Sequence, residues 1–349
     1  MSMEKNGTHK TRVILLFLVG LALFISIFYL IGFDKLFNQL LKVYLPYYLI
    51  SIAFIVLFVL LWALRWWLFV RKTDPRVPYF DILKNHVVGL AVNNLTPVAK
   101  LGGEPVKAYI LKKKHHISIG EGLATVLSDL TLEYIVSVGV VIVAIFLYIT
   151  YTNPPLWMLV IVLFFLLLAF LVLAGLMEIR SERDLIPKLI RWVSSRLKRI
   201  EAYTERILEG YKEFQQAFRR GLKDRKTFSA GLTLSILMKV AEITSYYFVF
   251  LSMGYEISPL ILVIIMGVNS MFLSIPATPG SLGVVEGGLI STFILLGVPS
   301  AEASAAVFLQ RIPQFWGVIV IGSLLGVHYG VSFWSKTGTG RKEMGMGGQ

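Results

Sequence analysis

The chain has 349 residues, of which 56% are hydrophobic and 16% are charged, and its mean hydropathy is +0.72. This composition excludes an ordinary soluble globular protein and indicates an integral membrane protein with several spans. The 34 basic residues exceed the 21 acidic ones to give a formal charge of +13, and the absence of cysteine excludes disulfides and thiolate metal sites.

Six charge-poor runs have the roughly 20 apolar residues that a helix needs to cross a bilayer. The first follows Lys10 and Arg12 without a convincing cleavage site, so we expect it to remain as an uncleaved span. Within the second, Arg65 is the only charged residue. The six predicted spans are residues 13–32, 45–70, 123–150, 156–177, 228–253 and 315–333.

Two further apolar stretches, 79–111 and 259–297, are each interrupted by a cluster of proline and glycine. An irregular backbone is tolerated at membrane depth only where protein or a watery cavity supplies its hydrogen bonds. We therefore predict two re-entrant helical hairpins; a pair of ordinary kinked spans at each place is the alternative.

The segment 178–226 combines many basic residues with apolar residues near helical spacing, which predicts amphipathic helix. It is expected either to lie along the inner membrane surface or to serve as a solvated linker. This linker separates one membrane half, 13–177, from a second, 227–335. The glycine-rich tail 336–349 is expected to be disordered.

Most of the Lys and Arg residues fall on one side of this topology, including the amino-terminal residues 1–12, the linker and the tail. Cytoplasmic loops carry such an excess, so we expect both termini in the cytoplasm and the chain in the cell membrane. The positive charge then reflects topology, and nucleic-acid binding is not expected.

With this topology the two hairpins enter the membrane from opposite sides, as in transporters built from inverted repeats. In each hairpin, Asn precedes Pro, then Gly, then Glu. The first trace contains Asn93, Asn94, Pro97, Gly103 and Glu104, and the second contains Asn269, Pro279, Gly280, Gly283 and Glu286. Pro and Gly break a helix, and Asn can hydrogen-bond the freed backbone.

Glu104 and Glu286 are functional candidates because a carboxylate at membrane depth costs several kcal/mol unless it is paired, solvated or protonated. The alternative is structural: each caps a buried helix or pairs with a cation. Arg311, before Pro313, could bind a phosphate through two nitrogens or form a salt bridge to Glu286.

Asp129 and Glu133 lie four residues apart on one face of the third span, and Lys239 and Glu242 lie three apart in the fifth. The first pair could act as acid and base or bind a cation. Salt bridges to Lys239, Lys100 or Arg311 are the alternative.

Enzyme signatures are sparse. Neither hairpin has the Gly-Lys-Ser/Thr of a phosphate-binding loop, and Ser281 lacks the Gly-x-Ser-x-Gly pattern of a hydrolase. We expect no catalytic residue, no metal site, no cofactor and no directly ATP-driven step.

Taken in order, these motifs resemble the lysylphosphatidylglycerol synthase transmembrane family, a flippase-like domain, over residues 10–335. They are Asn94-Leu-Thr-Pro97, Gly102-Gly-Glu-Pro-Val-Lys107, Ser128-Asp-Leu-Thr-Leu-Glu133, Pro279-Gly-Ser-Leu-Gly283 with Glu286, and Arg311 before Phe315-Trp316. The resemblance implies a lipid translocase. The aminoacyltransferase domain of the founding members is not expected here.

We therefore predict an all-α polytopic membrane protein that moves a lipid headgroup through a polar midplane cavity. The expected cargo is an anionic phospholipid, an aminoacyl-phospholipid or a polyprenyl-phosphate lipid, and a glycosyltransferase or lipid-synthesis enzyme is a possible partner. A membrane-embedded enzyme acting on lipid-linked phosphate or sugar, and a non-transporting scaffold, are the alternatives. The predicted site residues are Asn94, Pro97, Gly103, Glu104, Lys107, Asp129, Glu133, Pro279, Gly280, Gly283, Glu286 and Arg311.

Overall fold

The computed structural model describes residues 33–96, 102–151, 185–196, 204–272 and 278–328, with isolated positions at 22, 26, 163, 167 and 170. The regular elements in these ranges are all helices, which confirms the all-α prediction. Pro97, the predicted spans 13–32 and 156–177 and the tail 336–349 lie wholly or largely outside the described residues.

Four described helical units are long and apolar enough to cross a membrane. The predicted second, third and fifth spans are thereby confirmed as helices. The units are α3 (Leu45–Thr73), α6 (Ile119–Tyr151), α11 (Arg225–Ser252) and the continuous run of α14 (Ser300–Arg311), η3 (Ile312–Gly317) and α15 (Val318–His328).

The last of these units corrects a predicted boundary, because the helix begins at Ser300 and not near residue 315. Polar residues in 300–311 face other helices. Glu302 accepts a hydrogen bond from Gln39 of α2 (Phe33–Leu41) at 2.8 Å, and Gln310 is buried. Polar groups paired inside a bundle do not have to face lipid.

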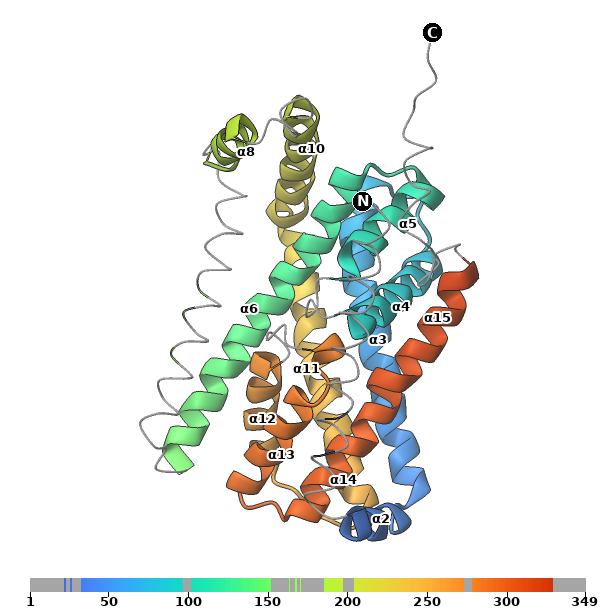
Figure 1. Cartoon of the computed structure of the whole chain (residues 1–349), viewed down its shortest axis with the longest axis vertical. Coiled ribbons are helices and arrows are strands. Elements are labelled where there is room, and N and C mark those ends of the chain that lie inside the picture. Colours follow the sequence, from blue (N-terminus) through green and yellow to red (C-terminus); the bar gives the residue numbers. More distant parts are fainter. Residues whose placement is uncertain are drawn as a thin grey trace, which may run out of the picture.

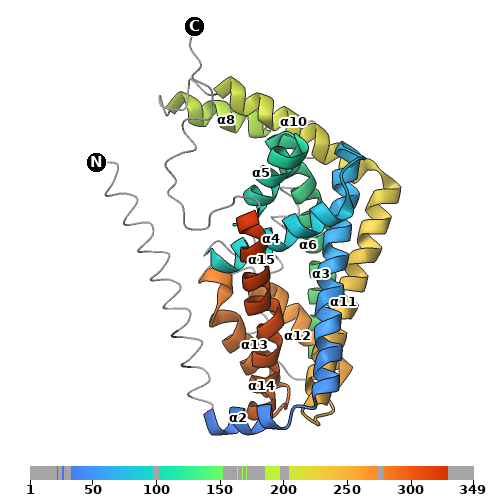
Figure 2. The same cartoon turned by 90° about the vertical axis from the view of Figure 1, so that its right-hand side faces the viewer.

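Each stretch predicted as a hairpin consists of two short helices that begin and end at the same end of the molecule (Figures 1 and 2). The first broken segment comprises α4 (Tyr79–Leu95) and α5 (Glu104–His115). Its α4 begins and its α5 ends at the end of the molecule opposite α2, which we call the α5 end (Figure 1). The second comprises α12 (Pro259–Phe272), η2 (Pro279–Ser281) and α13 (Val284–Leu295), and it starts and finishes at the α2 end. The two segments therefore point toward one another.

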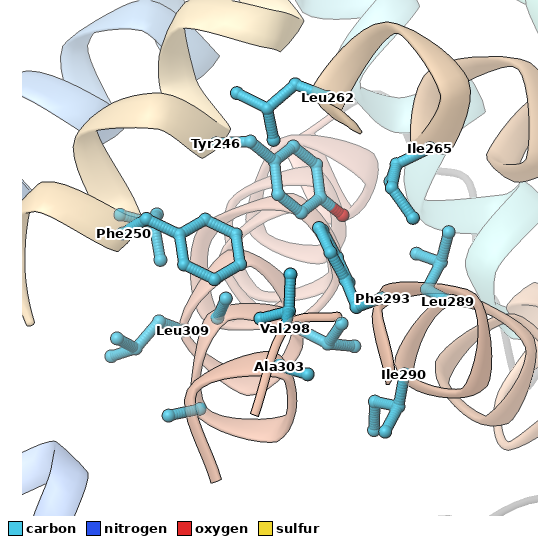
Figure 3. Close-up of a cluster of buried hydrophobic side chains, with 14 of the residues drawn as sticks. Tyr246, Phe250, Leu262, Ile265, Leu289, Ile290, Phe293, Val298, Ala303 and Leu309 are labelled. Atoms are coloured by element: carbon cyan, nitrogen blue, oxygen red, sulfur yellow. The ribbon is translucent and has the colours of Figure 1, made fainter. Parts of the chain in front are cut away.

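The largest apolar core lies between α11 and the second broken segment (Figure 3). Phe250 and Phe293 are fully buried there, with ring centroids 5.2 Å apart, and Leu262 and Leu289 pack around them. This packing fixes the second broken segment against a spanning helix.

A buried hydroxyl network joins three of the long helices. The Ser51 and Ser245 hydroxyls lie 2.9 Å apart, and Gln310 Nε2 donates to Ser245 Oγ at 3.0 Å. The small serine side chains let α3 and α11 lie side by side along their length (Figure 2).

The predicted amphipathic linker contains α8 (Leu185–Arg196) and α10 (Thr204–Lys223), which lie across the α5 end of the bundle (Figure 2). The apolar side of α10 is packed on protein: Phe214, Phe218 and Leu222 form a cluster with Phe69 of α3 and Leu132 of α6. This contact packs part of the linker on α3 and α6, and the position of the linker relative to the membrane stays a prediction.

Candidate functional site

The first broken segment places an acidic residue directly after its break. Asn93 Oδ1 accepts a hydrogen bond from the Gly103 backbone N–H at 2.6 Å, and Asn93 Nδ2 donates to Glu104 Oε1 at 3.2 Å. Lys107 Nζ lies 3.0 Å from Glu104 Oε2, and all three side chains are buried. The predicted site residues Gly103, Glu104 and Lys107 thus form one cluster, organised by an asparagine next to the predicted Asn94.

The two halves of this segment are in contact at two glycines. A β-carbon on Gly103 would lie 2.0 Å from the Gly89 backbone oxygen, so no other residue fits there without moving the backbone. Glycine at this position lets the start of α5 approach α4.

The second broken segment carries an equivalent acidic residue. Glu286 is fully buried in the first turn of α13 and its Oε2 accepts a hydrogen bond from the Gly283 N–H at 2.6 Å. Arg311 Nε lies 2.6 Å from Glu286 Oε1. Both structural alternatives considered for Glu286, a helix cap and a salt bridge to Arg311, are confirmed.

The tips of the two broken segments meet. A β-carbon on Gly280 would lie 3.0 Å from the Asn94 backbone oxygen and 2.3 Å from Phe315 Cε2. Gly280 has φ +58, a backbone conformation that favours glycine, and Pro279 before it is buried. The structure therefore brings the predicted residues Asn94, Pro279 and Gly280 to one place between the two halves of the chain.

Asp129 and Glu133 face Arg65 of α3, a partner that was not among those expected from the sequence. Arg65 Nε lies 2.6 Å from Asp129 Oδ1, and Arg65 Nη2 lies 3.2 Å from both Asp129 Oδ2 and Glu133 Oε2. Arg65 Nη1 donates to Ser235 Oγ at 2.7 Å, so one fully buried guanidinium joins α3, α6 and α11. Of the partners expected from the sequence, Lys239 lies in the field of Glu133, and Lys100 lies outside the described residues.

A tryptophan and a histidine extend this cluster toward the first broken segment. Trp62 Nε1 donates to Asp129 Oδ2 at 2.9 Å, and the Trp62 ring lies 4.8 Å from the ring of His86 in α4. Lys107 Nζ lies 5.8 Å from the centre of the same tryptophan ring. The side chain of Trp62 therefore separates the Arg65 cluster from the Glu104 cluster.

The ion pair expected within the fifth span is confirmed. Lys239 Nζ donates to Glu242 Oε2 at 3.0 Å, and Asn269 Nδ2, from α12, donates to Glu242 Oε1 at 3.2 Å. Asn269 was noted in the sequence only as part of the repeated motif. The Asn269 amide therefore connects the second broken segment to α11. In the first broken segment, the Asn93 amide connects α4 to α5 in the same way.

Buried polar atoms without a hydrogen-bond partner are concentrated in the broken segments and beside them. Among the described residues there are six such side-chain atoms: Asn85 Oδ1, His86 Nδ1, His86 Nε2, Glu104 Oε2, Glu286 Oε1 and Arg311 Nη2. Glu104 Oε2 and Glu286 Oε1 lie near cations, but those contacts lack hydrogen-bond alignment. Such groups are costly in a protein interior and are typical of places that take up water or a ligand.

Four residues of this site were absent from the predicted site: Arg65, His86, Asn93 and Trp62. A sequence signal existed for Arg65, since an isolated charge inside a predicted span marks a function or an ion pair. His86 and Asn93 also lie within a predicted hairpin, where burying a polar side chain without a hydrogen bond costs free energy.

The sequence model of the family described as "Lysylphosphatidylglycerol synthase TM region" matches residues 13–322. No solved structure matches.

Archaeal membrane proteins are among the relatives. A UPF0104 membrane protein of Methanothermobacter thermautotrophicus is 28% identical over 75% of this chain and 80% of its own length. Another, from Pyrococcus horikoshii, is 26% identical over 74% of this chain and 79% of its own. A third, from Methanocaldococcus jannaschii, is 28% identical over 67% of this chain and 92% of its own.

Proposed function

Because this chain belongs to the lysylphosphatidylglycerol synthase TM region family, we propose that it is a lipid translocase, which moves a phosphate-bearing lipid headgroup between leaflets. One observation carries the proposal: two oppositely directed broken segments meet at Asn94 and Gly280. Transporters built from inverted repeats bind their substrates at such junctions, near the bilayer midplane.

The polar atoms at this junction support a headgroup path. Arg311 Nη2 is a buried donor without a partner among the described residues, and a guanidinium suits a phosphate. Glu286 holds Arg311 in place through its carboxylate. In the proposed cycle the phosphate displaces this contact and binds Arg311, while the acyl chains stay in the bilayer.

The first broken segment supplies the other half of the path. Glu104 and Lys107 form a neutral buried pair beside the partnerless atoms of Asn85 and His86. A headgroup that carries both charges can pair with each member, so that neither Glu104 nor Lys107 is left buried without a counter-charge. Movement of the two segments relative to each other would expose the pair to one side at a time.

The proposed orientation places the α5 end in the cytoplasm. Arg71 and Lys72 end α3 there, and Lys112, Lys113 and Lys114 end α5. Basic residues accumulate on the cytoplasmic side of membrane proteins. The proposed location is the cell membrane, and the proposed cargo is an anionic phospholipid, an aminoacyl-phospholipid or a polyprenyl-phosphate lipid.

The contacts of Asp129 and Glu133 favour a translocase over an enzyme acting on lipid-linked phosphate or sugar. Both carboxylates are engaged with Arg65 and lie in the interior of α6. A general acid or base must reach the proton it transfers on a substrate. We therefore propose that the chain is not an enzyme.

A leaflet-accessibility assay on purified protein in liposomes tests the proposal. The lipids are labelled phosphatidylglycerol, aminoacyl-phosphatidylglycerol and a polyprenyl phosphate, and the variants are Glu286→Gln and Arg311→Gln. Wild type is expected to equilibrate at least one lipid, and each variant to slow it by about tenfold or more, as expected for loss of a charge-assisted contact.

The control is Glu256→Gln, since Glu256 is an exposed carboxylate in the loop between α11 and α12. It should transport like wild type. Folded wild-type protein that moves none of the three lipids would contradict the proposal and favour a non-transporting scaffold. A stable complex with a glycosyltransferase or lipid-synthesis enzyme would then support the scaffold function.

A further inference from the structure

We propose that the first broken segment contains a binding site for hydroxyl groups of the lipid headgroup, formed by His86 and Asn85 of α4 with Glu104 of α5. The choice of a lipid headgroup as the ligand rests on the proposed function, whereas the unused hydrogen-bonding atoms at the site do not. Water has the same hydroxyl chemistry, so the test has to separate these two sources.

His86 is completely buried with unused hydrogen-bonding atoms. Neither of its ring nitrogens has a hydrogen-bond partner among the described residues. Its ring centre lies 4.8 Å from that of Trp62 and 6.2 Å from that of Trp66. The indole N–H of Trp62 donates to Asp129 and that of Trp66 to Thr125, so neither donates to the imidazole. Such a buried group costs free energy unless water or a ligand completes its hydrogen bonds.

Two more side chains with an unused atom lie in the same part of the segment, around Lys107. Asn85 Nδ2 donates to the Lys107 backbone oxygen at 3.0 Å, and Asn85 Oδ1 has no partner in the described part of the chain. Glu104 Oε1 accepts from Asn93 and Lys107, while Glu104 Oε2 lies 3.0 Å from Lys107 Nζ without a hydrogen bond. His86 lies in the field of the same lysine. The three side chains are therefore grouped about Lys107.

The unused atoms include both a donor and acceptors. A neutral imidazole has one nitrogen that donates and one that accepts. The charged groups that act on His86 are the cations Lys107 and Arg65, which disfavour a further positive charge on the ring. Asn85 Oδ1 and Glu104 Oε2 only accept. Together the four atoms offer one donor and three acceptors.

A hydroxyl group matches this set, because its O–H donates and its oxygen accepts. A phosphate ester only accepts, so it would leave the three acceptors unpaired. An ammonium group only donates, and it would add a cation to a region that already holds Lys107 and Arg65. A headgroup with neighbouring hydroxyls, such as a glycerol or a sugar, therefore has the chemistry that the site lacks.

Lys107 is the part of the site that can move to admit a ligand. Its stem lies across Gly89 of α4, where a β-carbon would be 2.5 Å from Lys107 Cε. The lysine stem is flexible, and the glycine leaves the adjacent face of α4 without a side chain. Rotation of the lysine would make room for a headgroup without displacing either helix.

A run of contacts connects this site to Arg311, the proposed phosphate ligand. The Arg311 guanidinium lies 5.6 Å from the centre of the Phe315 ring, and the Phe315 backbone oxygen is 3.5 Å from Asn94 Nδ2. Asn93, the preceding residue, donates to Glu104. The phosphate and the hydroxyls of one headgroup can therefore meet both sites in the course of its passage.

This inference orders the proposed cargoes. Phosphatidylglycerol and its aminoacyl ester carry hydroxyl groups beyond the phosphate, whereas the headgroup of a polyprenyl phosphate has no carbon-bound hydroxyl. The lipids with a glycerol headgroup are therefore expected to bind more tightly.

Binding to the purified protein in detergent tests the site without measuring transport. The probes are short-chain phosphatidylglycerol and phosphatidylpropanol, which have the same charge and nearly the same size and differ in the two hydroxyls. Titration of the melting temperature with each lipid gives its Kd. Wild type is expected to bind phosphatidylglycerol at least about tenfold more tightly, as expected for one buried hydrogen bond.

His86→Phe and Asn85→Leu are each expected to reduce this preference to about twofold or less. The ratio of the two affinities is the readout, because a structural defect would weaken the binding of both lipids alike. The matched control is His115→Phe, the same substitution at a histidine that contacts Asp81 at the α5 end. It should keep the preference.

Equal affinity of wild type for the two lipids overturns the proposal whether or not any variant folds, and it assigns the unused atoms to buried water. A preference that survives both substitutions overturns the assignment to His86 and Asn85.

The same pair of lipids in liposomes separates this proposal from the proposed function. Preferential binding of phosphatidylglycerol without movement of either lipid contradicts the translocase and leaves the hydroxyl site standing. Movement of both lipids at equal rates, with equal affinities, contradicts the hydroxyl site and leaves the translocase standing.

Discussion

Gly280 in the second broken segment lies against the backbone of Asn94 in the first, so closely that a β-carbon on it would be 3.0 Å from the Asn94 oxygen. The same β-carbon would lie 2.3 Å from the Phe315 ring, and the backbone has φ +58. This contact between the tips belongs to residues 186 positions apart in the chain.

We expect Gly280→Ala to lower the free energy of unfolding by about 1–3 kcal/mol, because it adds both overpacking and backbone strain. Thermal unfolding of the purified protein in detergent measures the change. The control is Gly139→Ala, since nothing lies within 4 Å of a β-carbon there. If Gly280→Ala were as stable as the control, the tips could not be as close as described.

A more severe effect is expected for Gly103→Ala. The new methyl group would lie 2.0 Å from a backbone oxygen of Gly89, which no change of side-chain rotamer can relieve. The start of α5 must then move away from α4 and lose the Asn93 hydrogen bond to Gly103. We expect little monodisperse protein on gel filtration at an expression level that gives wild type in full. Normal yield would show that the two helices separate easily.

Removal of the shared cation Arg65 should lower the free energy of unfolding more than removal of the carboxylate of Glu133. Arg65→Gln removes the cation that both Asp129 and Glu133 contact, and breaking a buried ion pair from one side typically costs about 3–5 kcal/mol. Glu133→Gln leaves the two contacts of Arg65 with Asp129 in place, so its effect on thermal stability should be smaller. Equal losses in the two variants would argue against Arg65 as the centre of this cluster.

The start of α11 gives a pH-dependent prediction outside the spanning segments. A hydrogen bond from Lys72, followed by one from Thr227 at 2.8 Å, lowers the pKa of Asp224 to about 2 from its ordinary value of 3.8. Because the folded pKa is the lower one, the stabilisation is fully present above about pH 4 and is lost as the pH falls through 2.

We therefore expect Asp224→Asn to have a lower melting temperature than wild type at neutral pH, with the difference shrinking below pH 4. Lys72→Gln removes the main cause of the shift and should behave in the same direction. A difference that stays constant down to pH 2 would mean that the carboxylate has no special role at this helix start. Asp224 is partly exposed to solvent, so the effect is small.

Local chemistry explains which parts of the fold were predictable. Proline and glycine clusters mark both helix breaks, and long apolar runs mark α3, α6 and α11. The last helix was placed too late, with its beginning near residue 315. The chain instead forms the wide helical turn η3 around Pro313, which accommodates the missing N–H and continues the helix from α14 to α15.

The site was predictable in its residues but less so in its pairings. Glu104, Glu286 and Arg311 were found because charged groups in apolar segments are rare. The partner of Asp129 was not, since Arg65 lies 64 residues earlier and nothing in local spacing relates α3 to α6. The packing of α10 against Phe69 depends on the same kind of long-range contact.

The position of Arg65 also has a consequence for synthesis of the protein. The ribosome makes Arg65 64 residues before Asp129 and 170 residues before Ser235. When α3 first reaches the translocation machinery, its guanidinium has none of the partners that neutralise it in the finished bundle. Releasing α3 alone into lipid would expose that charge to hydrocarbon. We therefore expect the machinery to retain α3 until α6 has been synthesised, so that the two helices enter the bilayer together.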